Sequence, residues 1–281
     1  MSARAESHES NPHDALAGLR KWRLERRDSE EGRTYVHPET GEIFHSVTRI
    51  LGATAPAHQK AALERWLERP TAIQERDLAA NRGTTAHNSA EYLLKTGAKL
   101  ARQTANKRGV WKPREDGLER CPPAITKWGL EKALEGAPRV SWHASGYARG
   151  LKHWIVENVT AIHAVEFSGF HPGGWAGTCD ALTDVAGTLT ICDWKTSANA
   201  RSEEMLTNYI DQLGAYSLQL KHLTGICPKA GAIVVARRSG APQVRMLSEL
   251  ELRGAESRFT ERAIQYFEDL AHSLEAGAAI H

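Results

Sequence analysis

Cysteine is scarce in this sequence, and its spacing excludes several kinds of site. The four cysteines are scattered and form no CxxC pair, so they fit neither a zinc site, nor an iron–sulfur cluster, nor the disulfide framework of a small secreted domain. Two of them each precede an aspartate in a predicted strand, and alternation turns each thiol away from its acidic neighbour. We therefore expect buried free thiols at Cys121, Cys179, Cys192 and Cys227.

Long hydrophobic runs are also missing. No segment approaches the ~20 apolar residues of a membrane-spanning helix, and residues 1–15 lack the apolar core of a signal peptide. We therefore expect a cytoplasmic protein that does not associate with membranes. An excess of one charge is lacking too: 36 Lys and Arg against 34 Asp and Glu give a net charge of +2, which does not by itself indicate a polyanionic partner.

The remaining composition is that of an ordinary globular protein. With 281 residues, 41% hydrophobic and 25% charged, the chain can bury a substantial core. We expect a disordered tail over 1–15 and a single domain over 16–281. Helical patterns dominate 16–158 and strand patterns enter at 159–281, which predicts an α/β fold with a central mixed β-sheet flanked by helices, preceded by an N-terminal helical region.

Hydrophobic periodicity and turn residues predict the individual elements. Helices are expected at 14–27, 58–68, 84–94, 124–134, 144–158, 203–223 and 249–274, with a break at 82–84. Strands are expected at 34–37, 43–45, 161–170, 230–237 and 243–247. The segment 97–117 has little apolar periodicity and many basic residues, so it is expected to be a solvated loop or a basic flap.

The stretch from Gly177 to Lys195 organises the sequence. Two runs of β-prone residues flank a turn-like break at 185–187, which predicts a hairpin with Asp180 on the first arm and Asp193 on the second. Alternation puts Asp193 and Lys195 on one face of the strand and Trp194 on the other. A core does not accept such charges unless they are paired or bound to an ion. Two carboxylates and an ammonium group suit a hard divalent cation and a phosphate ester.

Three further features accompany this hairpin. Gly83 and His87 form a GxxxH pattern near a predicted helix start, and Glu166 lies in the strand before the hairpin. Downstream, Gln212 and Tyr216 are four residues apart on one helix face, with Tyr209 one turn earlier.

Taken together and in this order, these residues resemble the RecB-type exonuclease branch of the PD-(D/E)xK nuclease superfamily. The branch combines a GxxxH helix, a glutamate strand, GxxD, a (D/E)xK strand and a QxxxY helix. The stretch Ser46–Leu51 is also similar to the family of mitochondrial genome maintenance exonucleases and their phage relatives. Cys179 stands where the superfamily's name has proline, and the cysteines that hold an iron–sulfur cluster in some relatives are absent. The resemblance implies a restriction-endonuclease-like core without such a cluster.

The resemblance also implies roles for the site residues. Asp180 and Asp193 would be metal ligands, aided by the Trp194 backbone carbonyl and by His87. Lys195 would orient or deprotonate the attacking water. Imidazole beside carboxylates admits Mn²⁺ as well as Mg²⁺. Glu166 is either an outer ligand with catalytic support or an ordinary strand residue.

Residues that would position DNA are less specific. Gln212, Tyr216 and Tyr209, with Thr196 after the catalytic lysine, either contact DNA or pack a helix against the sheet. Basic residues of the 97–117 segment either grip a single strand through phosphates and base stacking, or carry solvated charge. The residues of this segment that we assign to DNA are three basic residues and one aromatic residue: Lys107, Arg108, Trp111 and Lys112.

The sequence thus predicts a Mg²⁺- or Mn²⁺-dependent deoxyribonuclease. We expect an exonuclease that acts on single-stranded or free-ended DNA in recombination, repair or phage DNA processing, in a bacterial or phage-infected cell. A non-catalytic nucleic-acid-binding module on the same fold and a structure-specific endonuclease are the alternatives, because fold alone does not determine chemistry.

Overall fold

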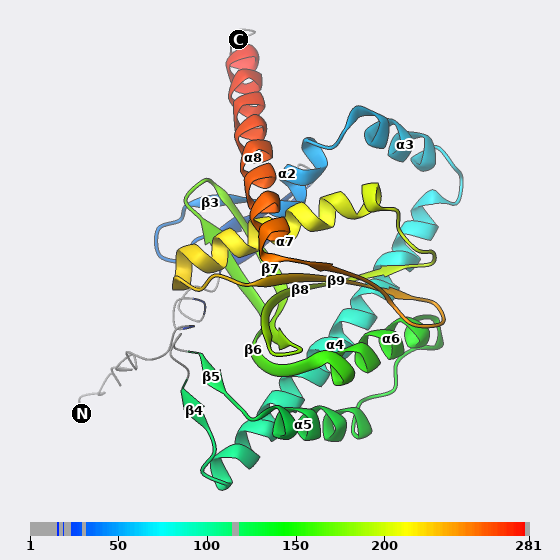
Figure 1. The fold of residues 1–281 in the computed structure, drawn as a ribbon. Coiled ribbons are helices and arrows are strands. Elements are labelled where there is room, and N and C mark those ends of the chain that lie inside the picture. The colour runs from blue at the N-terminus through cyan, green and yellow to red at the C-terminus, as the bar shows by residue number, and fades with distance from the viewer. Residues whose placement is uncertain (1–15, 17–18, 20–23, 30–31, 114–117, 279–281) are drawn as a thin grey trace, which may run out of the picture.

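A mixed β-sheet with helices on both faces forms the body of the protein. The computed structural model describes residues 16, 19, 24–29, 32–113 and 118–278. Within these residues the main sheet has eight strands, in the order β1-β2-β3-β7-β8-β9-β10, with β6 pairing β7 (Figure 1). Strands β3 and β7 and strands β8 and β9 are parallel, and the other neighbours are antiparallel. The predicted mixed sheet is therefore confirmed. The strands of the main sheet are β1 (Glu25–Ser29), β2 (Gly32–Val36), β3 (Ile43–Ser46), β6 (Val159–His171), β7 (Trp175–Val185), β8 (Thr188–Ser197), β9 (Ala230–Arg237) and β10 (Gln243–Leu247).

The helices divide between the two faces of the sheet and close two hydrophobic cores. On one face α2, α7 and α8 pack against strand residues such as Leu182, Ile191 and Ile233. On the other face α4, α5 and α6 pack against Trp194 and Val234. In Figure 1 the first group lies above the strands and the second group below. The helices are α2 (Val47–Ala53), α3 (Ala57–Leu67), α4 (Ala72–Lys107), α5 (Pro123–Glu135), α6 (Trp142–Asn158), α7 (Glu203–Thr224) and α8 (Glu249–Ala278). Across the described part of the chain, none of them has both the length and the apolar character to cross a bilayer.

The sequence at both ends of α7 explains where this helix starts and stops. Ser202 caps its N-terminus by accepting the Met205 N–H, and Glu203 and Glu204 place negative charge in the first turn. Gly225 ends it at φ 74°, a conformation that glycine adopts without strain. The helix predicted over 203–223 is thus confirmed.

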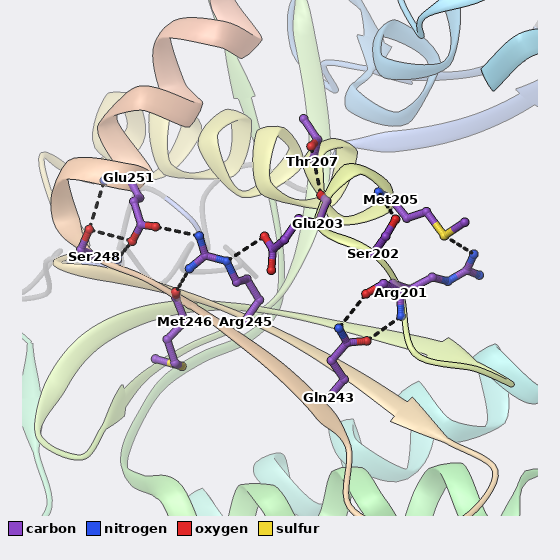
Figure 2. A network of polar contacts seen from close by, with 10 residues as sticks. All are labelled: Arg201, Ser202, Glu203, Met205, Thr207, Gln243, Arg245, Met246, Ser248 and Glu251. Atoms are coloured by element: carbon purple, nitrogen blue, oxygen red, sulfur yellow. Dashed lines mark hydrogen bonds and ion pairs between the residues drawn. The ribbon is translucent and has the colours of Figure 1, made fainter. Parts of the chain in front are cut away.

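The connection between the end of β8 and α7 is held by strand β10, as Figure 2 shows. The Gln243 side chain accepts the Arg201 N–H at 2.7 Å and donates to the Arg201 carbonyl at 2.8 Å. Two residues further along β10, Arg245 lies 3.3 Å from Glu203 and 2.7 Å from Glu251. These contacts tie the start of α7 and the start of α8 to the same edge of the sheet.

Helix α4 differs from the prediction. The expected break at 82–84 and the expected loop from 97 are wrong, because α4 runs without interruption from Ala72 to Lys107. Gly83 lies inside it, where an added Cβ would be 3.3 Å from the Thr196 Oγ1, so tertiary packing overrides the low helix propensity of glycine. Further along, Gly97 packs so closely on α5 that a Cβ would lie 2.7 Å from the Leu130 side chain.

The N-terminal part is less helical than predicted. Residues 25–27, expected in a helix over 14–27, belong to β1, and the rest of that span lies mostly outside the described residues. Strands β1, β2 and β3 join the main sheet ahead of the helices, so the hairpin expected at 34–37 and 43–45 is confirmed as β2–β3. A separate pair joins β4 (Lys112–Pro113), within the segment expected as a loop or flap, to β5 (Glu119–Arg120), which follows that segment. The predicted tail over 1–15 lies outside the described residues.

The cysteines behave largely as expected. All four are free; Cys121, Cys179 and Cys192 are buried, and Cys227 is half-buried.

Candidate metal and phosphodiester site

The site lies where strand β7 changes neighbours. Along one edge β7 pairs with β6 over its length. Along the other edge β3 pairs with Trp175 and Ala176, and β8 pairs only from Ala181 onward. The residues between, including Gly177 and Asp180, have no strand partner on that edge within the described part of the chain. The GxxD motif therefore spans an opening in an otherwise continuous sheet.

Asp180 bridges this opening. Its Oδ2 accepts the Trp194 backbone N–H at 2.5 Å, on β8 beyond the last β7–β8 pair. Its Oδ1 lies 3.2 Å from His87 Nδ1 of α4. Burial alone would raise the pKa of Asp180, but His87, Lys195 and the Trp194 N–H outweigh it and hold the pKa below its usual value. Asp180 is therefore a buried, ionised carboxylate.

Three side chains converge as a cation site would require. The ligating atoms of His87, Glu166 and Asp180 all lie within 4.8 Å of one another. Glu166 comes from β6, where its neighbours in the ladder flank Asp180. Its backbone has φ 51°, a strained conformation for a residue with a side chain. The oxygen and imidazole donors suit Mg²⁺ or Mn²⁺.

The electrostatics of Glu166 show an excess of negative charge at this point. Burial, with the charges of Asp180 and Glu91, raises the pKa of Glu166 to about 8. For His87, burial and the neighbouring charge act in opposite directions. Burial would lower the pKa, but Asp180 raises it above the usual value. A bound cation would oppose the upward shift of the Glu166 pKa, because its positive charge favours the ionised carboxylate.

Asp193 and Lys195 form an ion pair beside this group. Lys195 Nζ lies 2.5 Å from Asp193 Oδ2, and the two side chains are 19% and 3% exposed. Burial raises the pKa of Asp193 to about 6, although Lys195 opposes the shift. The ammonium group also lies 5.0 Å from the centre of the Tyr209 ring. Trp194 packs in the core on the other face, so the predicted alternation is confirmed. Asp193 lines the same cleft but does not belong to the tight group of three.

The glycines and the QxxxY pair show how the motifs fit together. Gln212 Nε2 donates to the Tyr216 hydroxyl at 2.6 Å, and both side chains are buried. A Cβ on Gly177 would lie 2.7 Å from a Tyr216 ring carbon. The GxxD glycine thus leaves room for the QxxxY tyrosine, just as Gly83 leaves room for Thr196.

The basic residues assigned to DNA are not brought to this site. Lys107 is 20 positions beyond His87 on the same helix, which corresponds to about 30 Å. Arg108 and Lys112 are exposed near the same end. Trp111 packs against a small core of Ala101, Ala105, Cys121 and Ile125, with Arg102 stacked over its ring at 5.1 Å.

A cleft of about 520 Å³ contains the candidate site and shows residues that sequence reasoning missed. Asn88 and Glu91 follow His87 on α4, and the i+4 spacing of Glu91 was a signal that could have found it. Arg26, Arg33 and Tyr35 of the β1–β2 hairpin also line the cleft, and no motif pointed to them. The arrangement combines a donor group that suits a cation with a lysine that can neutralise a phosphate.

Comparisons with known proteins show which family the sequence matches. The sequence model of the PD-(D/E)XK nuclease superfamily matches residues 57–280. Mitochondrial genome maintenance exonuclease 1 of Mus musculus is 26% identical over 210 residues, which cover 70% of this chain and 51% of the mouse protein. The Homo sapiens protein of the same name is 26% identical over 220 residues, covering 76% of this chain and 55% of the human one. The chain thus spans about half the length of the curated relatives it matches.

A solved structure with some likeness is a putative exonuclease from Eubacterium rectale. It is 12% identical to this chain, with a TM-score of 0.33, and the match covers 64% of this chain and 83% of that one.

Proposed function

Because the chain belongs to the PD-(D/E)XK nuclease superfamily, we propose that it is a metal-dependent deoxyribonuclease that hydrolyses phosphodiester bonds. In our proposal it is an exonuclease on single-stranded or free-ended DNA and serves recombination, repair or phage DNA processing. The observation that carries the proposal is the convergence of His87, Glu166 and Asp180 beside the Asp193–Lys195 pair in one cleft.

His87, Glu166 and Asp180 would hold Mg²⁺ or Mn²⁺, and Asp193 with the Trp194 carbonyl would complete the ligands. When bound, such a cation neutralises the scissile phosphate and lowers the pKa of a coordinated water. The fit rests on the donor chemistry and on the 4.8 Å span of the three donor atoms.

Lys195 would act on the attacking water and on the phosphate. Its ammonium is held charged, because Asp193 and Asp180 outweigh the effect of burial and raise its pKa. In that state it donates hydrogen bonds to the water and to the phosphate oxygen that gains charge. Asp193 fixes its position from 2.5 Å away. Gln212 and Tyr216 would brace the strand that carries Asp180, with Tyr209 and Thr196 beside the lysine.

Cleavage of end-labelled DNA tests the proposal. Single- and double-stranded substrates labelled at the 5′ or the 3′ end are incubated with Mg²⁺, Mn²⁺ or EDTA. Wild type is compared with Lys195→Ala and with Lys132→Ala, an exposed lysine paired with Glu135 on α5. We expect metal-dependent loss of label in wild type and Lys132→Ala but not in Lys195→Ala, and the label lost first gives the polarity.

Two results would contradict the proposal. Binding without cleavage under every metal would favour a non-catalytic nucleic-acid-binding module. Digestion of a closed circular single strand would favour an endonuclease, since an exonuclease needs an end.

A further inference from the structure

The β1–β2 hairpin has one face that carries two arginines toward the candidate site. In the register of the hairpin Arg26 lies opposite Tyr35, and Asp28 lies opposite Arg33. Residues two apart on a strand share a face, so all four side chains project from the same side. Arg27 lies on the other side, where it is paired with Glu25 at 3.0 Å.

This face is anchored beside the catalytic strand. Tyr35 is 4% exposed and packs in a small core with Phe44 and Ala176, the residue that precedes Gly177 on β7. Strand β3 fixes the arrangement, because its Ser46 pairs with Ala176. As a result Arg26, Arg33 and Tyr35 line the same cleft as Asp180 and Lys195.

The many acidic residues in the cleft would give the two arginines a role in binding an anionic substrate. Four acids line the cleft around the donor group, against the single lysine Lys195: Glu91, Glu166, Asp180 and Asp193. An anionic strand entering such a cleft meets repulsion unless cations line its approach. Arg26 and Arg33 supply that charge from outside the residues that match the family model, 57–280.

The present partner of both arginines can be displaced. Asp28 lies 2.8 Å from Arg26 and 2.9 Å from Arg33, and its side chain is 58% exposed. Ion pairs at such exposure contribute little stability, so a ligand can replace the carboxylate at small cost. A carboxylate held between two guanidinium groups occupies the place that a phosphate group fits, since guanidinium binds both in bidentate geometry.

We propose that Arg26 and Arg33 form a binding subsite for a backbone phosphate of the substrate strand, which takes the place of Asp28. The inference rests on the proposed nuclease function and names how that site holds its substrate. A phosphate contact carries no sequence information, so the subsite positions the strand without base preference. Arg26 and Arg33 are positioning residues, because they act on a phosphate other than the one that reacts.

Binding of a fluorescent single-stranded oligonucleotide is measured by anisotropy at several salt concentrations, in the Lys195→Ala background so that the strand stays intact. Into it we introduce Arg26→Ala, Arg33→Ala and, as a matched control, Arg27→Ala, which removes the same charge from the opposite face. We expect Arg26→Ala and Arg33→Ala each to weaken binding roughly 10-fold. Each should also lower the slope of log Kd against log salt by about 0.7, the value for one single-strand phosphate contact. Arg27→Ala should leave the slope unchanged.

An uncharged methylphosphonate in place of one phosphate shows which phosphate of the strand the arginines contact. Oligonucleotides with one methylphosphonate at successive positions are bound to the parent protein and to Arg33→Ala. We expect one position at which the methylphosphonate weakens binding to the parent but not to Arg33→Ala, because the two changes remove the same interaction. Asp28→Asn should tighten binding by removing the competing carboxylate.

Two outcomes would overturn the inference. One is an equal loss for Arg26→Ala, Arg33→Ala and Arg27→Ala, which would indicate long-range charge alone. The other is the absence of any methylphosphonate position that depends on Arg33. Neither resembles a failure of the nuclease proposal, which would appear as intact end-labelled DNA with wild-type protein in every metal. In wild type the arginine variants should raise KM and leave kcat nearly unchanged.

Discussion

The two antiparallel hairpins that face the cleft, β7–β8 and β1–β2, carry similar ion pairs in opposite surroundings. The Lys195–Asp193 pair on β8 is 19% and 3% exposed, whereas the Arg26–Asp28 pair on β1 is 51% and 58% exposed. Burial shifts the pKa of Asp193 to about 6, against the lowering effect of Lys195 and His87. In the β1–β2 hairpin, water screens the charges and a ligand can exchange for either partner. If both proposals hold, a buried pair of opposite charges suits the reaction and an exposed pair suits substrate binding.

The largest expected effect comes from breaking the buried pair or the buried carboxylate. Lys195→Ala and Asp180→Asn should each lower the rate of cleavage at least about 1,000-fold. Asp180→Asn keeps the size of the side chain, so its circular dichroism spectrum and thermal unfolding show whether the fold is retained. Unimpaired metal-dependent cleavage by either folded variant would show that the β7–β8 hairpin takes no part in the reaction.

The next effect concerns the glycine that lets the catalytic hairpin pack. Gly177→Ala places a Cβ 2.7 Å from the Tyr216 ring and should lower the free energy of unfolding by about 1–3 kcal/mol, measured in urea. Gly52→Ala is the matched control, because this exposed helical position in α2 has no neighbour within 4 Å of the added Cβ. It should stabilise by about 0.4–1 kcal/mol. Equal effects of both would mean that Gly177 has no steric role.

The half-buried acid Glu166 should make the metal-free protein sensitive to pH. Its pKa of about 8 in the folded protein lies above the unfolded value of 4.5. The folded state therefore binds the proton more tightly, and this contribution, full below pH 4.5, is lost as the pH rises to 8. In EDTA, wild type should lose about 1–2 kcal/mol of stability between pH 5 and 8 relative to Glu166→Gln, after discounting for partial exposure. Urea titrations at each pH measure this, and parallel curves for the two proteins would contradict it.

The smallest expected effect sharpens the other side of the comparison. Asp28→Asn removes the common partner of Arg26 and Arg33, yet the free energy of unfolding should change by no more than the error of a urea titration, because Asp28 and Arg26 are exposed to solvent and Arg33 is only half-buried. The change should be undetectable in high salt as well. A clear loss of stability would show that Asp28 is structural rather than a displaceable partner.

The motif residues were predictable because each has a local signature. The alternation of Asp193, Trp194 and Lys195 follows from the period of a strand, and Gln212 and Tyr216 meet because helical residues four apart are neighbours. The order of strands and helices from 159 onward also follows from periodicity. Their metal and DNA roles remain predictions that the cleavage experiments test.

What could not be predicted depends on contacts between distant segments. Gly83 reads as a helix breaker, but it lies within α4 because Thr196 packs against it. The stripe Gly97, Ala101 and Ala105 is too small to give a strong apolar pattern, yet it packs closely against α5. Nothing local indicates the φ of 51° at Glu166.

The opening beside Gly177 has a consequence for how the protein combines rigidity with access. In open α/β sheets ligands bind at switch points, where neighbouring strands diverge and leave a crevice at the strand ends. Here the switch occurs within one strand, because β7 exchanges β3 for β8 without ending. Asp180 therefore keeps the backbone of an internal strand, because its neighbours Cys179 and Ala181 pair with β6 along the other edge, while its side chain lines a cleft. The crevice therefore lies in the middle of the sheet rather than at the ends of its strands.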